Sequence, residues 1–181
     1  MAVEPGDGMR ASFNGGAPLV AGRAERLPFA AASFDVVVCG QAFHWFAGRA
    51  ALAEIHRILR PGGRFWLLWN VRERTVEWAQ ELADLTEPHR SGVPSYRDGS
   101  WRSAFDDATT LFTPLEQREF PYEHEIDAGT MVDRMASISW IGALPHAERA
   151  DLLAKVRRLF DGMPPRFPVP YHTDVWWTSK A

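Results

Sequence analysis

The sequence predicts an α/β fold built on an open, mostly parallel sheet. Two short apolar runs, FDVVV at residues 34–38 and FWLLW at residues 65–69, suit strands that are covered on both faces. Between them Leu52, Ile55 and Ile58 recur at helical spacing, and Pro61-Gly62-Gly63 is typical of a helix end. A strand, a helix and a strand in this order form a βαβ unit, in which ligands bind beyond the carboxyl ends of the strands. We therefore expect the functional site in the loop at residues 40–46.

The residues before this unit alternate in the same way, in shorter pieces. Residues 2–4 are predicted to end a strand before the Pro5-Gly6 turn, and residues 19–21 are predicted to form another. Between them we expect a short helix over residues 7–13 with Met9 and Phe13 facing inward.

The residues after Trp69 continue the α/β pattern, so we expect residues 1–181 to form a single domain. Asp127 is predicted to cap a helix. A strand is expected within residues 112–122, with Pro114 and Pro121 marking its ends. The other predicted elements are a helix over 73–85, a long surface loop over 88–100, a short helix over 101–107, a helix over 147–160 and a strand over 169–177.

Composition excludes several classes of protein. The net charge is -3 and the basic residues are scattered, which does not favour a nucleic-acid partner. The single cysteine, Cys39, excludes an internal disulfide framework and fits a reducing compartment. No segment is apolar over a length that would span a bilayer, so we expect a cytoplasmic protein without a membrane partner.

The segment QAFHWF, residues 41–46, has the strongest chemical character. Gln41 can donate or accept hydrogen bonds, His44 titrates near neutral pH, and Trp45 offers a flat apolar wall. The plain alternative is a packed aromatic turn with a hydrogen-bonded histidine.

Two earlier segments are weaker candidates. Glu4 follows a predicted strand, where an acid can accept hydrogen bonds from ribose hydroxyls, although a solvated turn residue is the simpler interpretation. The segment AERLPF, residues 24–29, offers Glu25 beside an apolar pair that could flank a purine or belong to the core.

Other catalytic patterns are absent from the sequence. The remaining histidines lack the mutual spacing of metal ligands, so no metal is expected. There is no Gly-x-Ser-x-Gly elbow, no Walker loop and no Gly-x-Gly-x-x-Gly fingerprint.

Taken in order, the segments AVEPGDGMR, AGRAERLPFAAASFDVVVCGQAFHWF and EIHRILRPGGRFWLLWN resemble class I S-adenosylmethionine-dependent methyltransferases of the small-molecule branch called methyltransferase type 11. The resemblance extends to PYHTDVWW, which is similar to the closing antiparallel strand of that family. It implies a Rossmann-like doubly wound sheet, S-adenosylmethionine as cofactor and a small-molecule methyl acceptor.

The resemblance also implies roles for individual residues. Glu4 matches the acid that binds the ribose hydroxyls, and Ala24 and Glu25 match the loop that contacts adenine. Gln41, Ala42 and Phe43 match the segment that lines the methionine part of the cofactor. His44 and Trp45 match the methyl-transfer site, where His44 would serve as a base or as a substrate contact. Arg23 departs from the family, which often has an acid at that position.

The family's first strand and Gly-rich turn should precede Met1, so we expect the fold to be incomplete at its N-terminus. Without that strand, residues 2–4 would lack an inner partner, and we expect weak or undetectable cofactor binding and doubtful activity. A non-catalytic remnant or partner-binding domain remains the alternative, and an exposed sheet edge would invite homo-oligomers. A short dehydrogenase fragment is a third possibility, against which the missing nicotinamide fingerprint counts.

Overall fold

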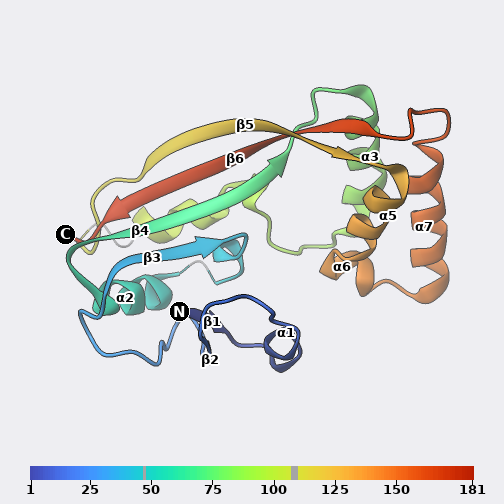
Figure 1. Ribbon diagram of the computed structural model, residues 1–181. Coiled ribbons are helices and arrows are strands. Elements are labelled where there is room, and N and C mark those ends of the chain that lie inside the picture. The colour runs from blue at the N-terminus through green and yellow to red at the C-terminus, as the bar shows by residue number, and fades with distance from the viewer. Residues whose placement is uncertain (47, 107–109) are drawn as a thin grey trace. The chain divides into compact units, whose positions relative to one another are not determined.

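A computed structural model describes residues 1–46, 48–106 and 110–181 of the chain (Figure 1). These residues form two compact units, and the chain passes between them several times. Unit 1 comprises Met1–Trp69, Pro94–Arg118 and Val175–Ala181, and unit 2 comprises Asn70–Val93 and Glu119–Asp174. We describe each unit by itself; the single domain expected from the sequence stays a prediction.

Unit 1 begins with a small parallel sheet of two strands. Strand β1 (Ala2–Glu4) pairs in register with β2 (Leu19–Ala21), so that Glu4 lies opposite Ala21. Both predicted strands are confirmed. Among the described strands, β2 is the one that pairs with β1.

Helix α1 (Asp7–Ala11) connects these two strands and is shorter than predicted. The expectation that Met9 and Phe13 face inward is wrong, because their exposed fractions are 68% and 42%. A helix of five residues has little more than one turn, and among the described residues none of α1 is buried.

The central βαβ unit is confirmed. Strand β3 (Phe34–Gly40) runs parallel to β4 (Leu59–Arg72), with register pairs from Val36–Arg64 to Gly40–Leu68. Helix α2 (Arg49–Ile58) joins them and buries its apolar stripe, including Leu52. The 3₁₀ turn η1 (Phe43–Trp45) lies between β3 and α2.

Pro61-Gly62-Gly63 forms an irregularity within β4 rather than a turn before it. The register shifts here, because Phe34 pairs with Leu59 whereas Val36 pairs with Arg64. Gly62 has a φ of 72°, and a Cβ on Gly63 would lie 2.9 Å from the carbonyl oxygen of Arg60. The two glycines therefore let the chain leave α2 and enter the sheet with almost no connecting loop.

The prediction that β3 is covered on both faces is wrong. Val36 and Val38 are 48% and 59% exposed, and β3 is at the edge of the sheet whose order is β3-β4-β6-β5. An apolar run indicates a preference for burial, but at this edge of the described sheet Val36 and Val38 remain largely exposed.

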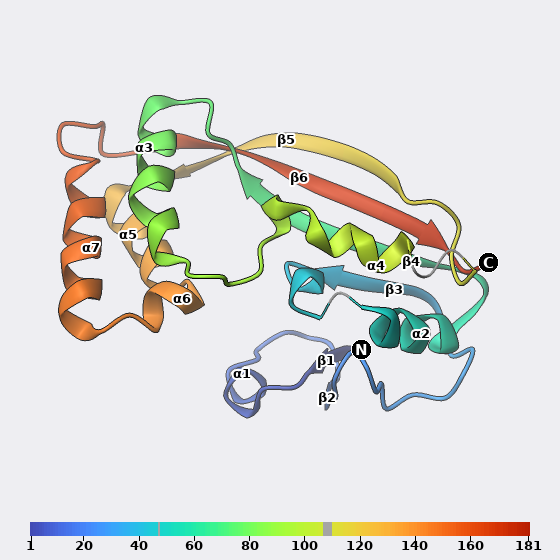
Figure 2. The same cartoon turned by 180° about the vertical axis from the view of Figure 1, so that it is seen from behind.

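Residues 88–106 contain short turns rather than a featureless loop. In unit 2, η2 (Glu87–His89) follows α3 (Glu77–Thr86). In unit 1, η3 (Tyr96–Asp98), η4 (Ser100–Arg102) and α4 (Ser103–Asp106) follow one another, and Figure 2 shows α4 on the same side of β3 and β4 as α2. The predicted helix over 101–107 is thus an η4–α4 pair, with Asp107 outside the described residues.

Unit 2 has its own core, in which α3, α5 (Ala128–Ala136) and α7 (His146–Arg158) pack together. Asp127 caps α5 as predicted, because its Oδ1 accepts a hydrogen bond from the amide of Thr130 at 2.8 Å. The short helix α6 (Ser139–Gly142) precedes α7. The core includes Leu82, Ile126, Met131, Met135, Ile141, Leu152, Val156, Phe160, Phe167 and Val169.

The last two strands are β5 (Glu116–Ile126) and β6 (Phe167–Ser179). Figure 1 draws β6 in the opposite direction to β4 and β5. Pro121 lies inside β5, so the prediction that it marks the end of the strand is wrong. Since β5 is an edge strand, a proline can lie there without removing a hydrogen bond from the sheet. Among the described residues, no helix is both long and apolar enough to cross a membrane.

Candidate functional site

The chain turns sharply at the carboxyl end of β3. Gln41 has a φ of 56°, in the left-handed region, and its amide donates to the carbonyl oxygen of Leu68 at 2.8 Å. A residue other than glycine rarely adopts this conformation, and such strain concentrates at functional sites. Gln41 is exposed, and Ala42 leads directly into η1.

His44 lies between a buried and an exposed tryptophan. The indole Nε1–H of Trp69 donates to Nδ1 of His44 at 3.1 Å, and Trp69 is only 1% exposed. On the other side, the ring centroid of Trp45 lies 5.4 Å from that of His44, and Trp45 is 52% exposed. The segment thus places a titratable ring beside a large exposed apolar surface at the edge where ligands bind in such sheets.

Phe43 has a different role from its neighbours. Its side chain is fully buried, with ring centroids 5.7 Å from Phe65 and 6.2 Å from Trp101. The side chain of Phe43 therefore belongs to the core, and the predicted cofactor contact at this position is left to its backbone. The burial of Phe43 and the hydrogen bond to His44 agree with the plain alternative of a packed aromatic turn, and the cofactor and substrate roles of QAFHWF stay predictions.

The rings behind His44 form an aromatic cluster, which we define as Phe43, Phe65, Trp69, Tyr96, Trp101 and Phe105. Trp69 stacks on Tyr96 at 4.5 Å between centroids and contacts Trp101 at 4.7 Å. Unlike Trp69, Trp101 has a buried Nε1 without a hydrogen-bond partner among the described residues. The cluster makes the wall behind His44 rigid.

Among the described residues, two charged groups lie near this wall: the guanidinium of Arg102, 4.9 Å from the ring centroid of Trp101, and the carboxylate of Asp98. The hydroxyl and the amide of Ser100 donate to its carboxylate and hold the pKa of Asp98 below its usual range, with smaller contributions from the amide of Ser95 and from His44. Asp98 is exposed and organises the turn at η3.

Cys39 is not a nucleophile in this site. Burial raises the pKa of its thiol to about 12, although the backbone of Ala42 and Phe43 partly opposes this effect. The thiol is therefore neutral at physiological pH and lacks the thiolate that nucleophilic attack requires.

The predicted ribose and adenine contacts lie together at the other sheet of unit 1. Glu4 ends β1, and its Oε1 accepts a hydrogen bond from the amide of Gly6 at 2.8 Å. Ala24 and Glu25 follow β2, whose Ala21 is paired with Glu4. Since the carboxyl ends of parallel strands meet at one edge, the three predicted residues share that edge. The Glu25 carboxylate lies 3.5 Å from the guanidinium of Arg23.

Two residues that the sequence did not single out hold this loop in place. On α2, Oε2 of Glu54 accepts from the amide of Leu27 at 2.9 Å, and the guanidinium of Arg57 donates to the carbonyl oxygen of Phe29 at 2.7 Å. Glu54 and Arg57 also pair with each other at 2.8 Å. Their i,i+3 spacing was the available signal, but it is common on exposed helices.

Unit 2 contains a group that sequence spacing could not indicate. Ligand atoms of Glu119, His172 and Asp174 lie within 4.8 Å of one another, because β5 and β6 are neighbours in the sheet. The sequence prediction that no metal is bound rested on the spacing of the histidines along the chain, which gives no information on such a group; that prediction stays untested. His172 pairs through Nδ1 with Glu73, and Glu119 is exposed.

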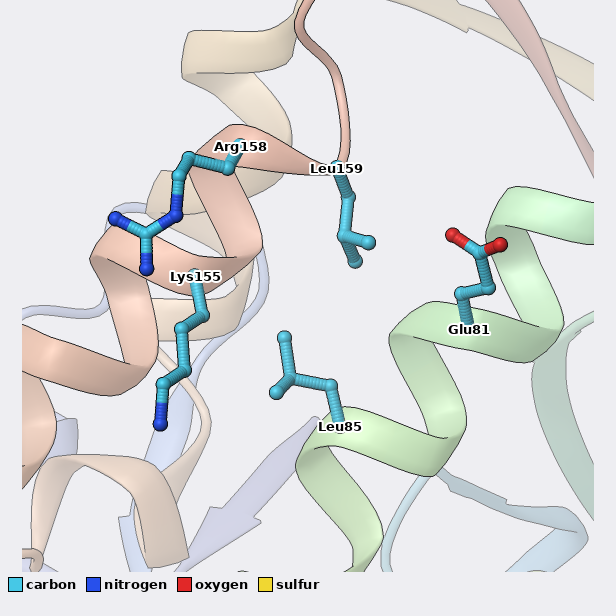
Figure 3. A pocket seen from close by; sticks show the side chains of 5 residues that line it. All are labelled: Glu81, Leu85, Lys155, Arg158 and Leu159. Carbon is cyan, nitrogen blue, oxygen red and sulfur yellow. The ribbon is translucent and has the colours of Figure 1, made fainter.

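A surface hollow of 520 Å³ lies between α3 and α7, also within unit 2. Figure 3 shows Leu85 and Leu159 pointing into the space between the two helices. Glu81, Lys155 and Arg158 complete its lining. The hollow contains none of the residues predicted to bind a cofactor or substrate.

Comparison with known proteins relates the first part of the chain to a known family. Residues 1–67, which end two residues before Trp69, match the family described as Methyltransferase domain. An uncharacterized methyltransferase-like protein of Schizosaccharomyces pombe is 32% identical over 144 residues, which are 80% of this chain and 56% of that protein. The chain spans about half the length of the curated relatives it matches.

Two solved structures share the fold. A protein provisionally assigned as a type II methyltransferase from Anaeromyxobacter dehalogenans is 21% identical, with a TM-score of 0.63 and coverage of 98% of this chain and 78% of that chain. A protein provisionally assigned as a methyltransferase from an antibiotic biosynthesis pathway of Anabaena variabilis is 18% identical, with a TM-score of 0.65 and coverage of 96% and 79%. The chain therefore has the Rossmann-like fold of the class I S-adenosylmethionine-dependent methyltransferases, and its sequence resembles that family.

Proposed function

We propose that this chain takes part in S-adenosylmethionine-dependent methyl transfer to a small-molecule acceptor. The observation that carries the proposal is the carboxyl end of β3, where the strained Gln41, the partly buried His44 and the exposed Trp45 lie within five residues of one another. A polar and aromatic segment at this position suits the binding of a small organic molecule.

The described residues fit the cofactor on the side of its nucleoside. Glu4 presents a carboxylate at the end of β1, and the amide of Gly6 orients one of its oxygens. A carboxylate so placed can accept hydrogen bonds from ribose hydroxyls. The loop that contains Ala24 and Glu25 follows the neighbouring strand and is anchored through Leu27 to Glu54.

In this proposal the protein's residues bind and orient the cofactor and the methyl acceptor, and none of them forms a covalent bond with either. S-adenosylmethionine would supply an electrophilic methyl group carried on a sulfonium. Glu4 and the loop of Ala24 would hold the nucleoside, and Trp45 would shield the acceptor from water. Holding two reactants in the reactive geometry can by itself lower the activation free energy of their reaction, by about 7 kcal/mol or more in favourable cases.

Calorimetric titration of the chain with S-adenosylmethionine tests the proposal. We expect weak but saturable binding that is lost in Glu4→Ala and retained in Glu116→Ala, an exposed acid at the start of β5. Chromatographic detection of S-adenosylhomocysteine in the presence of candidate acceptors then tests transfer. The absence of saturable binding up to millimolar cofactor would contradict the proposal.

A second candidate function is favoured by the uncovered edge of the larger sheet. Val36 and Val38 are exposed on β3, which has a described partner only in β4. An apolar edge strand suits the binding of another protein segment. If the titration shows no cofactor binding, a partner-binding domain of methyltransferase fold is the better assignment.

A further inference from the structure

We propose that Trp69 is a positioning residue that fixes the proton of His44 on Nε2, so that His44 does not act as a base and the methyl acceptor reacts through an atom that carries no proton. The inference rests on the proposed function for its chemical consequence. Its structural part concerns only the two side chains and can be tested on the protein alone.

The direction of the hydrogen bond follows from the chemistry of indole. The Nε1–H of Trp69 can only donate, and it lies 3.1 Å from Nδ1 of His44. Nδ1 must therefore supply a lone pair and cannot itself carry a proton. In the neutral ring the proton is then on Nε2, and the only basic lone pair of the imidazole faces Trp69.

Burial makes this arrangement difficult to reverse. Trp69 is 1% exposed and contacts both Tyr96 and Trp101, so water cannot easily replace His44 as the acceptor of its N–H. If His44 took up a proton, its Nδ1–H would face the indole N–H, and a buried donor would lose its partner. Protonation of His44 thus carries a cost that an ordinary surface histidine does not have.

One charged group acts in the opposite direction. The carboxylate of Asp98, on η3, interacts electrostatically with His44 and would favour an imidazolium. Asp98 is exposed and already accepts hydrogen bonds from Ser95 and Ser100. Solvent weakens its field, whereas the contact between Trp69 and His44 is direct. Of the other rings, Tyr96 stacks on Trp69 and Trp45 flanks His44.

The consequence for the reaction concerns the class of acceptor. With S-adenosylmethionine bound, the acceptor atom would use a lone pair to bond to the methyl carbon, and the electron pair of the carbon–sulfur bond would return to sulfur. With a carboxylate as acceptor, the product is a neutral methyl ester and no proton has to leave. An alcohol would have to lose a proton to a base, a role for which His44 has no available lone pair. We therefore infer an acceptor whose reacting atom carries no proton, for which a carboxylate is a suitable probe.

Nitrogen NMR of the protein with ¹⁵N-labelled histidine tests the position of the proton. We expect Nδ1 of His44 to give the signal of an unprotonated nitrogen, and Nε2 that of a protonated one, at neutral pH. In Trp69→Phe the bond to Nδ1 is lost, so we expect the titration midpoint of His44 to rise and the two tautomers to mix. Trp101→Phe is the matched control, because this tryptophan is equally buried in the same cluster and donates no hydrogen bond to a described residue. It should leave the His44 signals unchanged.

A protonated Nδ1 in the unmodified protein would overturn the inference, and this result does not require the Trp69 variant to fold. An equal response of His44 to both substitutions would also overturn it, because a general loosening of the cluster would then be the cause. Methyl transfer to benzoate but not to benzyl alcohol would support the acceptor class, and transfer to the alcohol with a rate that follows the titration of His44 would refute it. If neither acceptor reacts while the proton is found on Nε2, the proposed function fails and the assignment of Trp69 stands.

Discussion

Removal of the Glu54 carboxylate should loosen the loop that is predicted to contact adenine. Glu54 on α2 accepts hydrogen bonds from the amide of Leu27 and from two nitrogens of Arg57, at 2.8 to 2.9 Å. In Glu54→Ala the Leu27 amide loses its partner, and Arg57 loses the carboxylate that orients it toward Phe29. We expect the loop at residues 23–29 to open before the rest of unit 1.

The size of the effect follows from two independent considerations. The bond to Arg57 lowers the pKa of Glu54 from 4.5 to about 2, with desolvation opposing it and the Leu27 amide adding to it. A shift of that size would correspond to at most about 3.5 kcal/mol. The side chains of Glu54 and Arg57 are 21% and 36% exposed, however, so solvent screens the pair. With one amide also left unpaired, we expect a loss of about 1 to 2 kcal/mol in the free energy of unfolding.

The effect should depend on pH with a definite sign. The pKa of Glu54 is lower in the folded than in the unfolded chain, so its contribution is fully present above pH 4.5 and is lost as the pH falls toward about 2. The difference in stability between the unmodified protein and Glu54→Ala should therefore shrink across this interval.

Urea unfolding followed by tryptophan fluorescence, at pH 7 and at pH 3, measures both expectations. Hydrogen exchange at the Leu27 amide reports the loop separately. Asp151→Ala is the control, because Asp151 forms an exposed i,i+4 pair with Lys155 at 2.7 Å and holds no loop. The reasoning is refuted if the two variants lose equal stability, or if the exchange of Leu27 is the same with and without Glu54.

Two further predictions concern turns in the chain. Asp127→Ala should lower the melting temperature by about 2–4 °C, because the amide of Thr130 loses the side-chain cap of α5, and calorimetry of the variant beside Asp127→Asn checks it. Gly63→Ala should destabilise the protein by about 1 to 3 kcal/mol, because the new Cβ would lie 2.9 Å from a backbone oxygen in β4. Gly142→Ala should be nearly neutral in the same urea assay, because beyond its chain neighbours and its own helix backbone no described atom lies within 4 Å of the added carbon. Equal losses would contradict the steric argument.

The elements that sequence could predict are those whose signal is local. The βαβ unit follows from two apolar runs and one helical stripe, and the cap at Asp127 follows from one side chain and its nearest amide. The coverage of Val36 and Val38 could not be predicted, because it depends on which strand lies beside β3. Pro121 was misjudged for the same reason, since a proline inside a strand is acceptable only at an edge.

Residues of the candidate site could also be predicted only where neighbouring residues in the sequence identify them. Gln41 to Trp45 could be selected because their chemistry and their place after a strand are both local. Glu54 could not, because its partner Leu27 is 27 residues away. Asp174 and Glu119 could not be associated with His172 until β5 and β6 were known to be neighbours.

Trp69 shows how a residue can be predicted correctly for the fold and still be missed for the site. Its apolar ring indicates a buried strand, and it is 1% exposed as that pattern requires. Because Trp69 is buried, its indole N–H needs a hydrogen-bond acceptor from the protein. The parallel register pairs Leu68 with Gly40, so Trp69 lies where β3 ends and Nδ1 of His44 can accept this bond. The loop that leaves β3 then returns His44 to this position. A packing residue thus determines which nitrogen of a candidate functional residue carries the proton, because the strand that forms the core also ends at the site.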